Sequence, residues 1–252
     1  MKLVRFLDQG RPACGILRND EVAVLEGGLF PPFRERPTRL AAPTLTLLAP
    51  CVPSKIIAVG LNYRDHAEEL GMPVPDEPVL FLKPPTCVIG PGEAVRWPAM
   101  SGRVDYEAEL GVVIKDRVSG IAAGKAREHI LGYTCANDVT ARDLQKKDGQ
   151  WTRAKSFDTF CPVGPWIETD LEPGDLLIES FVNGERKQSS RTSQFIFPVE
   201  RLVSFISHVM TLEPGDLIIT GTPAGIGPMR PGDAVEVRIE GIGSLRNTVI
   251  AE

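Results

Sequence analysis

The chain has 252 residues, of which 42% are hydrophobic and 24% charged, and its formal net charge is −5. This is an ordinary globular composition, and the length suits one large domain or one large and one small domain. The negative charge argues against nucleic acid as a general partner, because phosphate binding requires a basic surface. No stretch approaches the roughly 20 apolar residues of a membrane helix, so a membrane partner is also excluded.

We expect a cytoplasmic protein. The beginning of the chain, MKLVRFLDQG, lacks the long apolar stretch of a signal peptide. The five cysteines are widely scattered, and no two have the spacing of a zinc site or a redox pair. This distribution predicts reduced thiols in a reducing compartment.

The first fifty residues predict a small antiparallel meander. Three short apolar runs, MKLVRFL, PACGILR and EVAVLEG, are separated by Asp-Gln-Gly and Asn-Asp. Prolines then recur between Pro31 and Pro53, a spacing typical of an extended connector. We therefore place a boundary near residue 50, with a small N-terminal accessory β domain at 1–50 and a larger domain at 51–252.

Strand signals dominate from Lys55 onward. Helical patterns are fewer and cover residues 63–71, 140–147 and 198–212. This predicts a β-rich α+β domain rather than the regular alternation of a doubly wound sheet. The predicted strands are KIIAVG, PVLFLK, DYEAELGVVIK, ILGYTCANDV, PVGPWIE, LLIESFVNG, DLIITGT and AVEVRIEG.

Two acids have strand spacing within DYEAELGVVI. Glu107 and Glu109 are two residues apart, so they share one face of a strand, and the run LGVVI that follows is expected to be buried on both faces. Two carboxylates in a buried strand repel each other, and a hard cation such as Mg²⁺ or Mn²⁺ relieves that repulsion. Asp138, at the end of another apolar run, supplies a third carboxylate. The alternative is a solvated acidic face with Asp138 as a helix N-cap, and spacing alone does not decide between them.

His66 lies at a predicted strand-to-helix transition, three residues before Glu69. On a helix the two side chains share a face, and a carboxylate beside an imidazole suits a general base. The alternative is an exposed histidine with a routine acidic neighbour. His129 and His208 have no comparable context, and we interpret both as structural.

Further polar residues follow the acids along the chain. Arg142 and Gln145 share a helical face, and Lys155 lies in an apolar, aromatic segment. Either cation could bind a substrate carboxylate or could form an ordinary surface ion pair. The segment GTPAGIG lacks the Gly-Lys-Ser/Thr ending of a P-loop, so it predicts a tight turn with one useful hydroxyl, that of Thr222.

Together these segments resemble the fumarylacetoacetate hydrolase superfamily. The resemblance covers residues 55 to about 240, and the first fifty residues resemble the accessory domain of many bacterial members. Its seven motifs occur in order as GLNYRDHAEELG, EPVLFLKP, DYEAELGVVI, NDVTARDLQ, AKSFDTFCPVGP, NGERKQSSRTSQFIF and GDLIITGTPAGIG.

The resemblance implies a rolled mixed β-sheet with few helices, a homodimer, and Mg²⁺ or Mn²⁺ held by Glu107, Glu109 and Asp138. It implies catalytic roles for His66, Glu69 and Lys155, with the histidine and its acid on a lid-like helix. It also implies substrate-binding roles for Arg142, Gln145 and Thr222.

The implied substrate is a small 2-oxo acid or dicarboxylate, chelated through its C1 carboxylate and 2-oxo group. Acylpyruvate hydrolysis, decarboxylation of an oxaloacetate-like acid and isomerisation of 2-hydroxyhepta-2,4-diene-1,7-dioate in aromatic catabolism all need the same enolate stabilisation, and they stay open. Two alternatives of other classes are a non-catalytic metal- or ligand-binding protein on this fold and a nucleotide-binding module that uses GTPAGIG.

Overall fold

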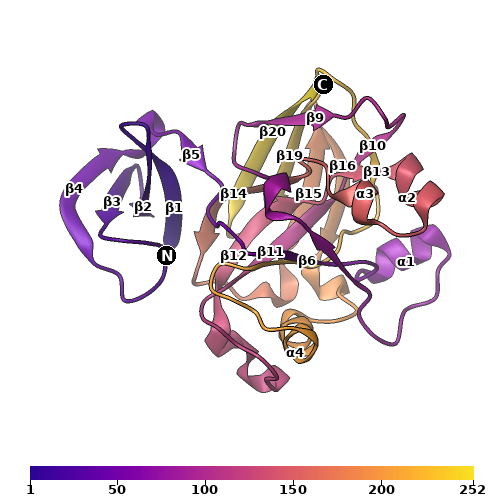
Figure 1. The fold of residues 1–252 in the computed structure, drawn as a ribbon, viewed down its shortest axis with the longest axis horizontal. Helices are drawn as coiled ribbons and strands as arrows, with labels where there is room; N and C mark the ends of the chain where they lie inside the picture. The colour runs from indigo at the N-terminus through magenta and orange to yellow at the C-terminus, as the bar shows by residue number, and fades with distance from the viewer.

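The computed structural model describes residues 1–252 and is built on one long mixed sheet (Figure 1). Its twelve strands follow the order β4-β3-β2-β1-β14-β12-β11-β17-β6-β7, with β5 paired to β1 and β8 to β14. Most pairs are antiparallel, whereas β6 with β17 and β8 with β14 are parallel. The strands are β1 (Lys2–Asp8), β2 (Arg11–Arg18), β3 (Glu21–Leu25), β4 (Glu35–Ala41), β5 (Leu47–Leu48), β6 (Ile56–Val59), β7 (Leu80–Lys83), β8 (Val88–Ile89), β11 (Ala108–Ile114), β12 (Ile130–Asn137), β14 (Cys161–Glu168) and β17 (Leu217–Ile219).

Two smaller sheets complete the β structure, in the orders β16-β15-β19-β20-β9 and β13-β10-β18. Apolar side chains of β11 pack with those of β15 and β19 in one core cluster, so the larger of the two sheets covers a face of the long one. The strands are β9 (Ala94–Trp97), β10 (Val104–Tyr106), β13 (Thr140–Ala141), β15 (Leu177–Val182), β16 (Glu185–Arg191), β18 (Gly227–Pro228), β19 (Ala234–Ile239) and β20 (Gly243–Ala251).

Four α-helices are present: α1 (Arg64–Leu70), α2 (Arg142–Asp148), α3 (Thr152–Lys155) and α4 (Val199–Val209). The first three gather at one end of the molecule, away from the N-terminal strands (Figure 1). Gly71 ends α1 in the left-handed conformation, with φ 61°, as its position after the helical pattern predicts. No helix is both long enough and apolar enough to cross a membrane. The predicted β-rich α+β class is confirmed.

Five short 3-10 turns connect these elements, at Ala42–Thr44, Pro85–Cys87, Ala123–His129, Pro173–Asp175 and Thr192–Gln194.

The prediction of an extended connector after the meander is wrong for residues Glu35–Ala41. These residues form β4, which pairs with β3 and extends the meander by a strand. Pro37 fits there because it lies on an edge strand, in the irregular part of the pairing between Glu35 and Arg39, where it has no partner in the ladder.

The boundary near residue 50 falls between β5 and β6, but the sheet is continuous across it. β1 pairs with β14 at Lys2↔Glu168 and Leu3↔Ile167. The division into an accessory and a catalytic domain stays a prediction.

The predicted single strand over DYEAELGVVI is interrupted at Glu107. β10 lies before it in the smallest sheet and β11 after it in the long sheet, and Glu107 belongs to neither. Every residue of β11 is buried, as expected for its apolar run. The acids therefore occur where the chain leaves one sheet and enters another.

Candidate active site

Three acids converge at this crossing point. Glu107 precedes β11, Glu109 lies within it, and Asp138 directly follows the neighbouring strand β12. The register pairs Ala108 with Asn137, so the end of β12 lies beside the start of β11. Potential ligand oxygens of the three carboxylates lie within 4.8 Å of one another, and all three residues are buried. The structure thus brings together the predicted metal ligands.

The backbone around Glu107 is held by hydrogen bonds outside the regular ladder. Its N–H donates to Oδ1 of Asn137 at 2.9 Å, and its carbonyl accepts from the N–H of Asp138 at 2.9 Å. Asn137, which the sequence analysis did not single out, therefore fixes the turn that aims both carboxylates inward. Its role depends on the pairing of two distant segments and has no local sequence signal.

Two buried lysines contact the acids. Nζ of Lys155 donates to Glu107 Oε2 at 2.7 Å and to Asp138 Oδ2 at 2.6 Å. Nζ of Lys83, which the sequence analysis missed, donates to Asp138 Oδ1 at 2.5 Å and to the Phe160 carbonyl at 3.0 Å. Burial opposes the charge of Lys83, but Asp138 more than offsets this effect and raises the pKa of the lysine above its ordinary value. A lysine that ends the apolar run PVLFLK is the signal that could have revealed it.

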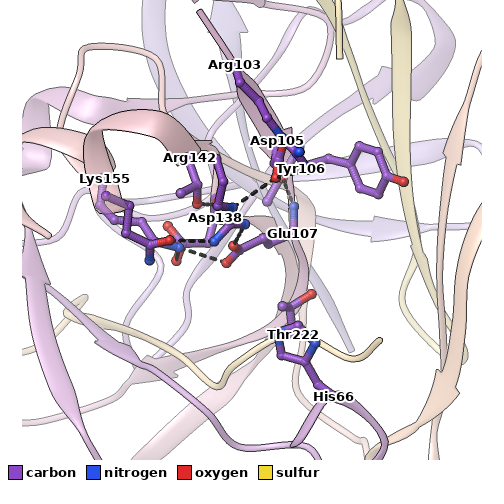
Figure 2. A network of polar contacts seen from close by, with 12 residues as sticks. His66, Arg103, Asp105, Tyr106, Glu107, Asp138, Arg142, Lys155 and Thr222 are labelled. Carbon is purple, nitrogen blue, oxygen red and sulfur yellow. Dashed lines mark hydrogen bonds and ion pairs between the residues drawn. The ribbon is translucent and has the colours of Figure 1, made fainter. Parts of the chain in front are cut away.

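Arg142 supplies the third cation of the cluster. Its guanidinium donates to Oε1 of Glu107 and to Asp105 Oδ2 at 2.9 Å (Figure 2). It also donates to Gln145 Oε1 at 2.6 Å. Asp105, a second residue missed from the sequence, also accepts from Arg103 at 2.8 Å. Of the predicted pair, Arg142 thus contacts the acid cluster directly and Gln145 contacts Arg142.

The electrostatic environments of the two glutamates differ. Burial disfavours the charged form of Glu107, but Lys155 and Arg142 prevail and lower its pKa to about 2. Burial raises the pKa of Glu109 well above its ordinary value, and the neighbouring charges of Asp138 and Glu107 raise it further. The hydrogen bond that Glu109 accepts comes from the N–H of Gly221 at 2.7 Å, and no cation contacts it directly.

The donor set fits a hard divalent cation. All three candidate ligands are carboxylates, as Mg²⁺ and Mn²⁺ prefer, and Glu109 is a buried acid without a cationic partner. The cations of Lys83, Lys155 and Arg142 equal the three acids in number, although all three pair with Glu107 or Asp138 and none with Glu109. Glu107, Glu109 and Asp138 could therefore hold such an ion at a cluster that is otherwise neutral.

His66 and Glu69 form the predicted pair on α1. Nδ1 of His66 lies 2.8 Å from Oε2 of Glu69, and Oε1 of Glu69 accepts from the N–H of Gly225 at 3.0 Å. The second contact ties the helix to the GTPAGIG segment, which is an irregular loop. His66 is buried and Glu69 partly exposed, so the imidazole is the inner member of the pair.

Asn62 fixes the entry into α1. It is fully buried, its Nδ2 donates to the Thr220 carbonyl at 2.7 Å and to the Phe197 carbonyl at 3.2 Å, and its Oδ1 accepts from the Phe197 N–H at 2.8 Å. Gly221 packs against it so closely that a Cβ there would lie 2.8 Å from Cβ of Asn62. Asn62 thus holds the strand that leads to His66 against the loop that carries Thr222.

One cavity of about 270 Å³ connects these groups. His66 and Thr222 lie together beside the cluster of Glu107, Asp138, Arg142 and Lys155 (Figure 2). The lining residues are Val59, Gly60, Leu61, His66, Leu70, Met72, Phe81, Glu107, Asp138, Arg142, Gln145, Lys146, Trp151, Lys155 and Thr222.

Thr222 is held in this wall by Gln188, another residue missed from the sequence. Nε2 of Gln188 donates to Thr222 Oγ1 at 2.8 Å, and its Oε1 accepts from the N–H of Ala108 at 3.0 Å. The loop hydroxyl is thereby coupled to the strand that carries Glu109. The loop has a structural role at the acid site, which differs from the free phosphate cradle of a nucleotide-binding module.

Comparison with known proteins gives matches over the whole chain. Residues 55–250 match the family model described as fumarylacetoacetate (FAA) hydrolase C-terminal, and residues 1–50 match the model described as Rv2993c-like, N-terminal. Protein Rv2993c of Mycobacterium tuberculosis is 52% identical over 87% of this chain and 83% of its own length.

Two solved structures are similar over their full length. The 5-carboxymethyl-2-hydroxymuconate delta-isomerase from Mycobacterium smegmatis is 44% identical with a TM-score of 0.95, and the alignment covers 100% of both chains. The 2-hydroxyhepta-2,4-diene-1,7-dioate isomerase from Mycobacterium marinum is 44% identical with a TM-score of 0.94, covering 100% of this chain and 99% of that one.

Proposed function

Because the chain belongs to the fumarylacetoacetate hydrolase family, we propose that it is a divalent-metal-dependent enzyme acting on an enolisable 2-oxo acid. The observation that carries the proposal is the buried trio of carboxylates, two of which, Glu107 and Asp138, line the cavity that His66 also lines. Glu107, Glu109 and Asp138 would hold Mg²⁺ or Mn²⁺, which when bound polarises a carbonyl and stabilises negative charge.

The charge of the cluster favours an anionic substrate. Its acids and cations are balanced, so a divalent ion leaves an excess of positive charge in a buried site. A ligand with a carboxylate that gains a further negative charge during the reaction compensates this excess. A 2-oxo acid that passes through its enolate has this property.

The other polar residues of the cavity have separate roles in stabilising charge and in orienting the substrate. Lys155 holds a positive charge beside Glu107 and Asp138, where it neutralises charge that develops on the substrate. Arg142, Gln145 and Thr222 line the same cavity and orient the bound acid.

His66 and Glu69 supply the proton transfer. Glu69 occupies Nδ1 of the imidazole, so Nε2 is the atom left to exchange a proton with water or substrate. In acylpyruvate-type hydrolysis, Nε2 takes a proton from the water that attacks the distal carbonyl. The bond between the acyl carbon and the pyruvate methylene then breaks, and pyruvate leaves as its enolate. Decarboxylation of an oxaloacetate-like acid needs the same stabilisation, with CO₂ as the other product.

The second candidate is an isomerase. Two full-length structural relatives are isomerases, one of them acting on 2-hydroxyhepta-2,4-diene-1,7-dioate. That reaction moves a proton along a conjugated enol and breaks no carbon–carbon bond, so His66 would shuttle a proton without activating water. The expected homodimer and the accessory role of residues 1–50 also remain part of this proposal.

A turnover screen with Mn²⁺ tests the function. Acetylpyruvate, oxaloacetate and 2-hydroxyhepta-2,4-diene-1,7-dioate separate hydrolysis, decarboxylation and isomerisation by their products. We expect metal-dependent turnover of at least one of them and its loss in Glu107→Ala. If Mg²⁺ and Mn²⁺ neither bind nor raise the melting temperature, and Glu107→Ala changes nothing, the protein is a binding module on this fold. A shift with ATP or GTP instead would favour the nucleotide-binding alternative.

A further inference from the structure

Helix α2 presents a row of polar side chains to the cavity. Arg142, Gln145 and Lys146 are spaced i, i+3 and i+4, so they lie on one face of the helix, and all three line the cavity. Arg142 is the innermost and contacts Glu107, Gln145 is partly buried, and Lys146 is exposed. The row therefore leads from the acid cluster to the cavity mouth.

Lys146 differs from the other cations of the cavity because its charge is not neutralised. Arg142 and Lys155 both pair with Glu107. The acids near Lys146 on its own helix are committed elsewhere: Asp143 accepts from Ser101 at 2.7 Å and from the N–H of Gly102 at 2.9 Å, and Asp148 pairs with Arg153. Lys146 thus offers a free ammonium at the cavity wall.

The surroundings of Lys146 favour a ligand over bulk water. Leu70 and Met72 also line the cavity, and they are apolar and cannot compensate a carboxylate. An anionic group entering between these side chains and α2 would lose part of its hydration, and the ammonium would replace the lost contacts. Four residues of helix at about 1.5 Å each place the backbone of Lys146 about 6 Å further along α2 than that of Arg142. This offset matches the length of a small dicarboxylate.

We propose that Lys146 binds a second carboxylate at the end of the substrate distant from the acid cluster, so that the preferred substrate is a 2-oxo dicarboxylate. The inference rests on the proposed function, because it places the first carboxylate of the substrate at Glu107, Glu109 and Asp138. It makes Lys146 a specificity-determining residue that does not touch the reacting atoms.

Calorimetry on the full chain loaded with Mn²⁺ tests the inference without requiring turnover. The probes are 2-oxoglutarate and 2-oxopentanoate, which share a 2-oxo acid head and a five-carbon chain but differ in the distal carboxylate. We expect 2-oxoglutarate to bind more tightly. Lys146→Ala should weaken it about five- to tenfold while 2-oxopentanoate stays within about twofold, and Lys146→Arg should retain the preference. Higher salt should reduce the preference in the wild type.

Lys147→Ala is the matched control, since it removes the same charge from the same helix at a side chain outside the cavity lining. If Lys146→Ala leaves the ratio of the two affinities unchanged, or lowers both affinities equally, or if Lys147→Ala has the same effect, the assignment of Lys146 is overturned. If Mn²⁺ binds but neither acid binds the loaded wild type, the proposed function and this inference fail together. Failure of Lys146→Ala alone leaves the proposed function standing.

Discussion

At the buried end of the cavity Glu107 and Asp138 are 5% and 1% exposed, and Glu109 behind them is 1% exposed, whereas Leu70 and Met72 at the mouth are 48% and 52% exposed. The carboxylates of Glu107 and Asp138 accept from Lys155 and that of Glu109 accepts from a backbone N–H, so a displaced donor there leaves a buried acid without its partner. The side chains at the mouth lie at the end of a short helix and in the loop after it. This difference indicates that the residues of the buried end determine the reaction. The residues of the mouth can differ according to which substrate is bound.

The largest effect should come from Glu109→Gln, which keeps the shape of the side chain and removes its charge. We expect Mn²⁺ affinity to fall by at least about 100-fold, and turnover with it, because one of three ligands is lost. Without metal the variant should be at least as stable as the wild type, because burial disfavours the ionised form of this carboxyl. Calorimetry and melting curves with and without Mn²⁺ measure both effects. Unchanged Mn²⁺ affinity would remove Glu109 from the metal site.

His66→Ala separates proton transfer from metal binding at the same end of the cavity. We expect hydrolysis or isomerisation to slow by about 10²- to 10⁴-fold, the usual contribution of a general base, while Mn²⁺ affinity stays within a few-fold. His208→Ala, on the exposed face of α4, is the control and should change neither quantity. A parallel loss of Mn²⁺ affinity in His66→Ala would mean that the imidazole is a ligand or that α1 supports the acids.

Asn62→Ala tests the junction that holds the two walls of the cavity together. The substitution leaves the N–H and carbonyl of Phe197 and the carbonyl of Thr220 without their present partner. We expect a loss of about 3 kcal/mol in the free energy of unfolding, measured by urea denaturation. A change below about 0.5 kcal/mol would show that water replaces the amide and that the junction is not rigid.

Met72→Ala should have the smallest effect. The side chain is half exposed, so the free energy of unfolding should change by less than about 0.5 kcal/mol. We expect kcat to be retained and KM to change by a few-fold for substrates with a long apolar tail. Steady-state kinetics on two substrates of different length measure this split. A large fall in kcat would contradict the division of the cavity into a reacting end and an adaptable mouth.

Local patterns were sufficient to predict part of the site. The two-residue spacing of Glu107 and Glu109 placed both acids at one site, and the three-residue spacing of His66 and Glu69 matched a real contact on α1. His66 and Glu69 lie within α1, and Glu107 directly precedes the strand that carries Glu109, so the period of the local backbone fixes which side chains are neighbours. Three of the four α-helices and most strands of the larger domain followed from the same periodicity, whereas α3 was not predicted.

The supporting residues could not be predicted in this way. Lys83, Asn137 and Gln188 act on acids or loops far from them in sequence, and each becomes visible only once its own strand, β7, β12 or β16, is placed in the fold. The interruption of the strand at Glu107 was missed for a similar reason. Its sequence favours a continuous strand, and the hydrogen bond that the Glu107 N–H donates to Oδ1 of Asn137 overrides that local preference.

The pairing of β1 with β14 has a consequence for how the protein avoids edge-to-edge aggregation of its main sheet. β14 is also a partner of β12, the strand that ends at Asp138, so part of its backbone is covered by β12 on one side and by the N-terminal meander on the other. Removing the meander would uncover the backbone groups of Ile167 and Glu168, and an uncovered strand recruits strands from other molecules. β1 therefore covers the backbone of β14 that would otherwise form a free sheet edge. In this way it protects the sheet that carries the acids from aggregation.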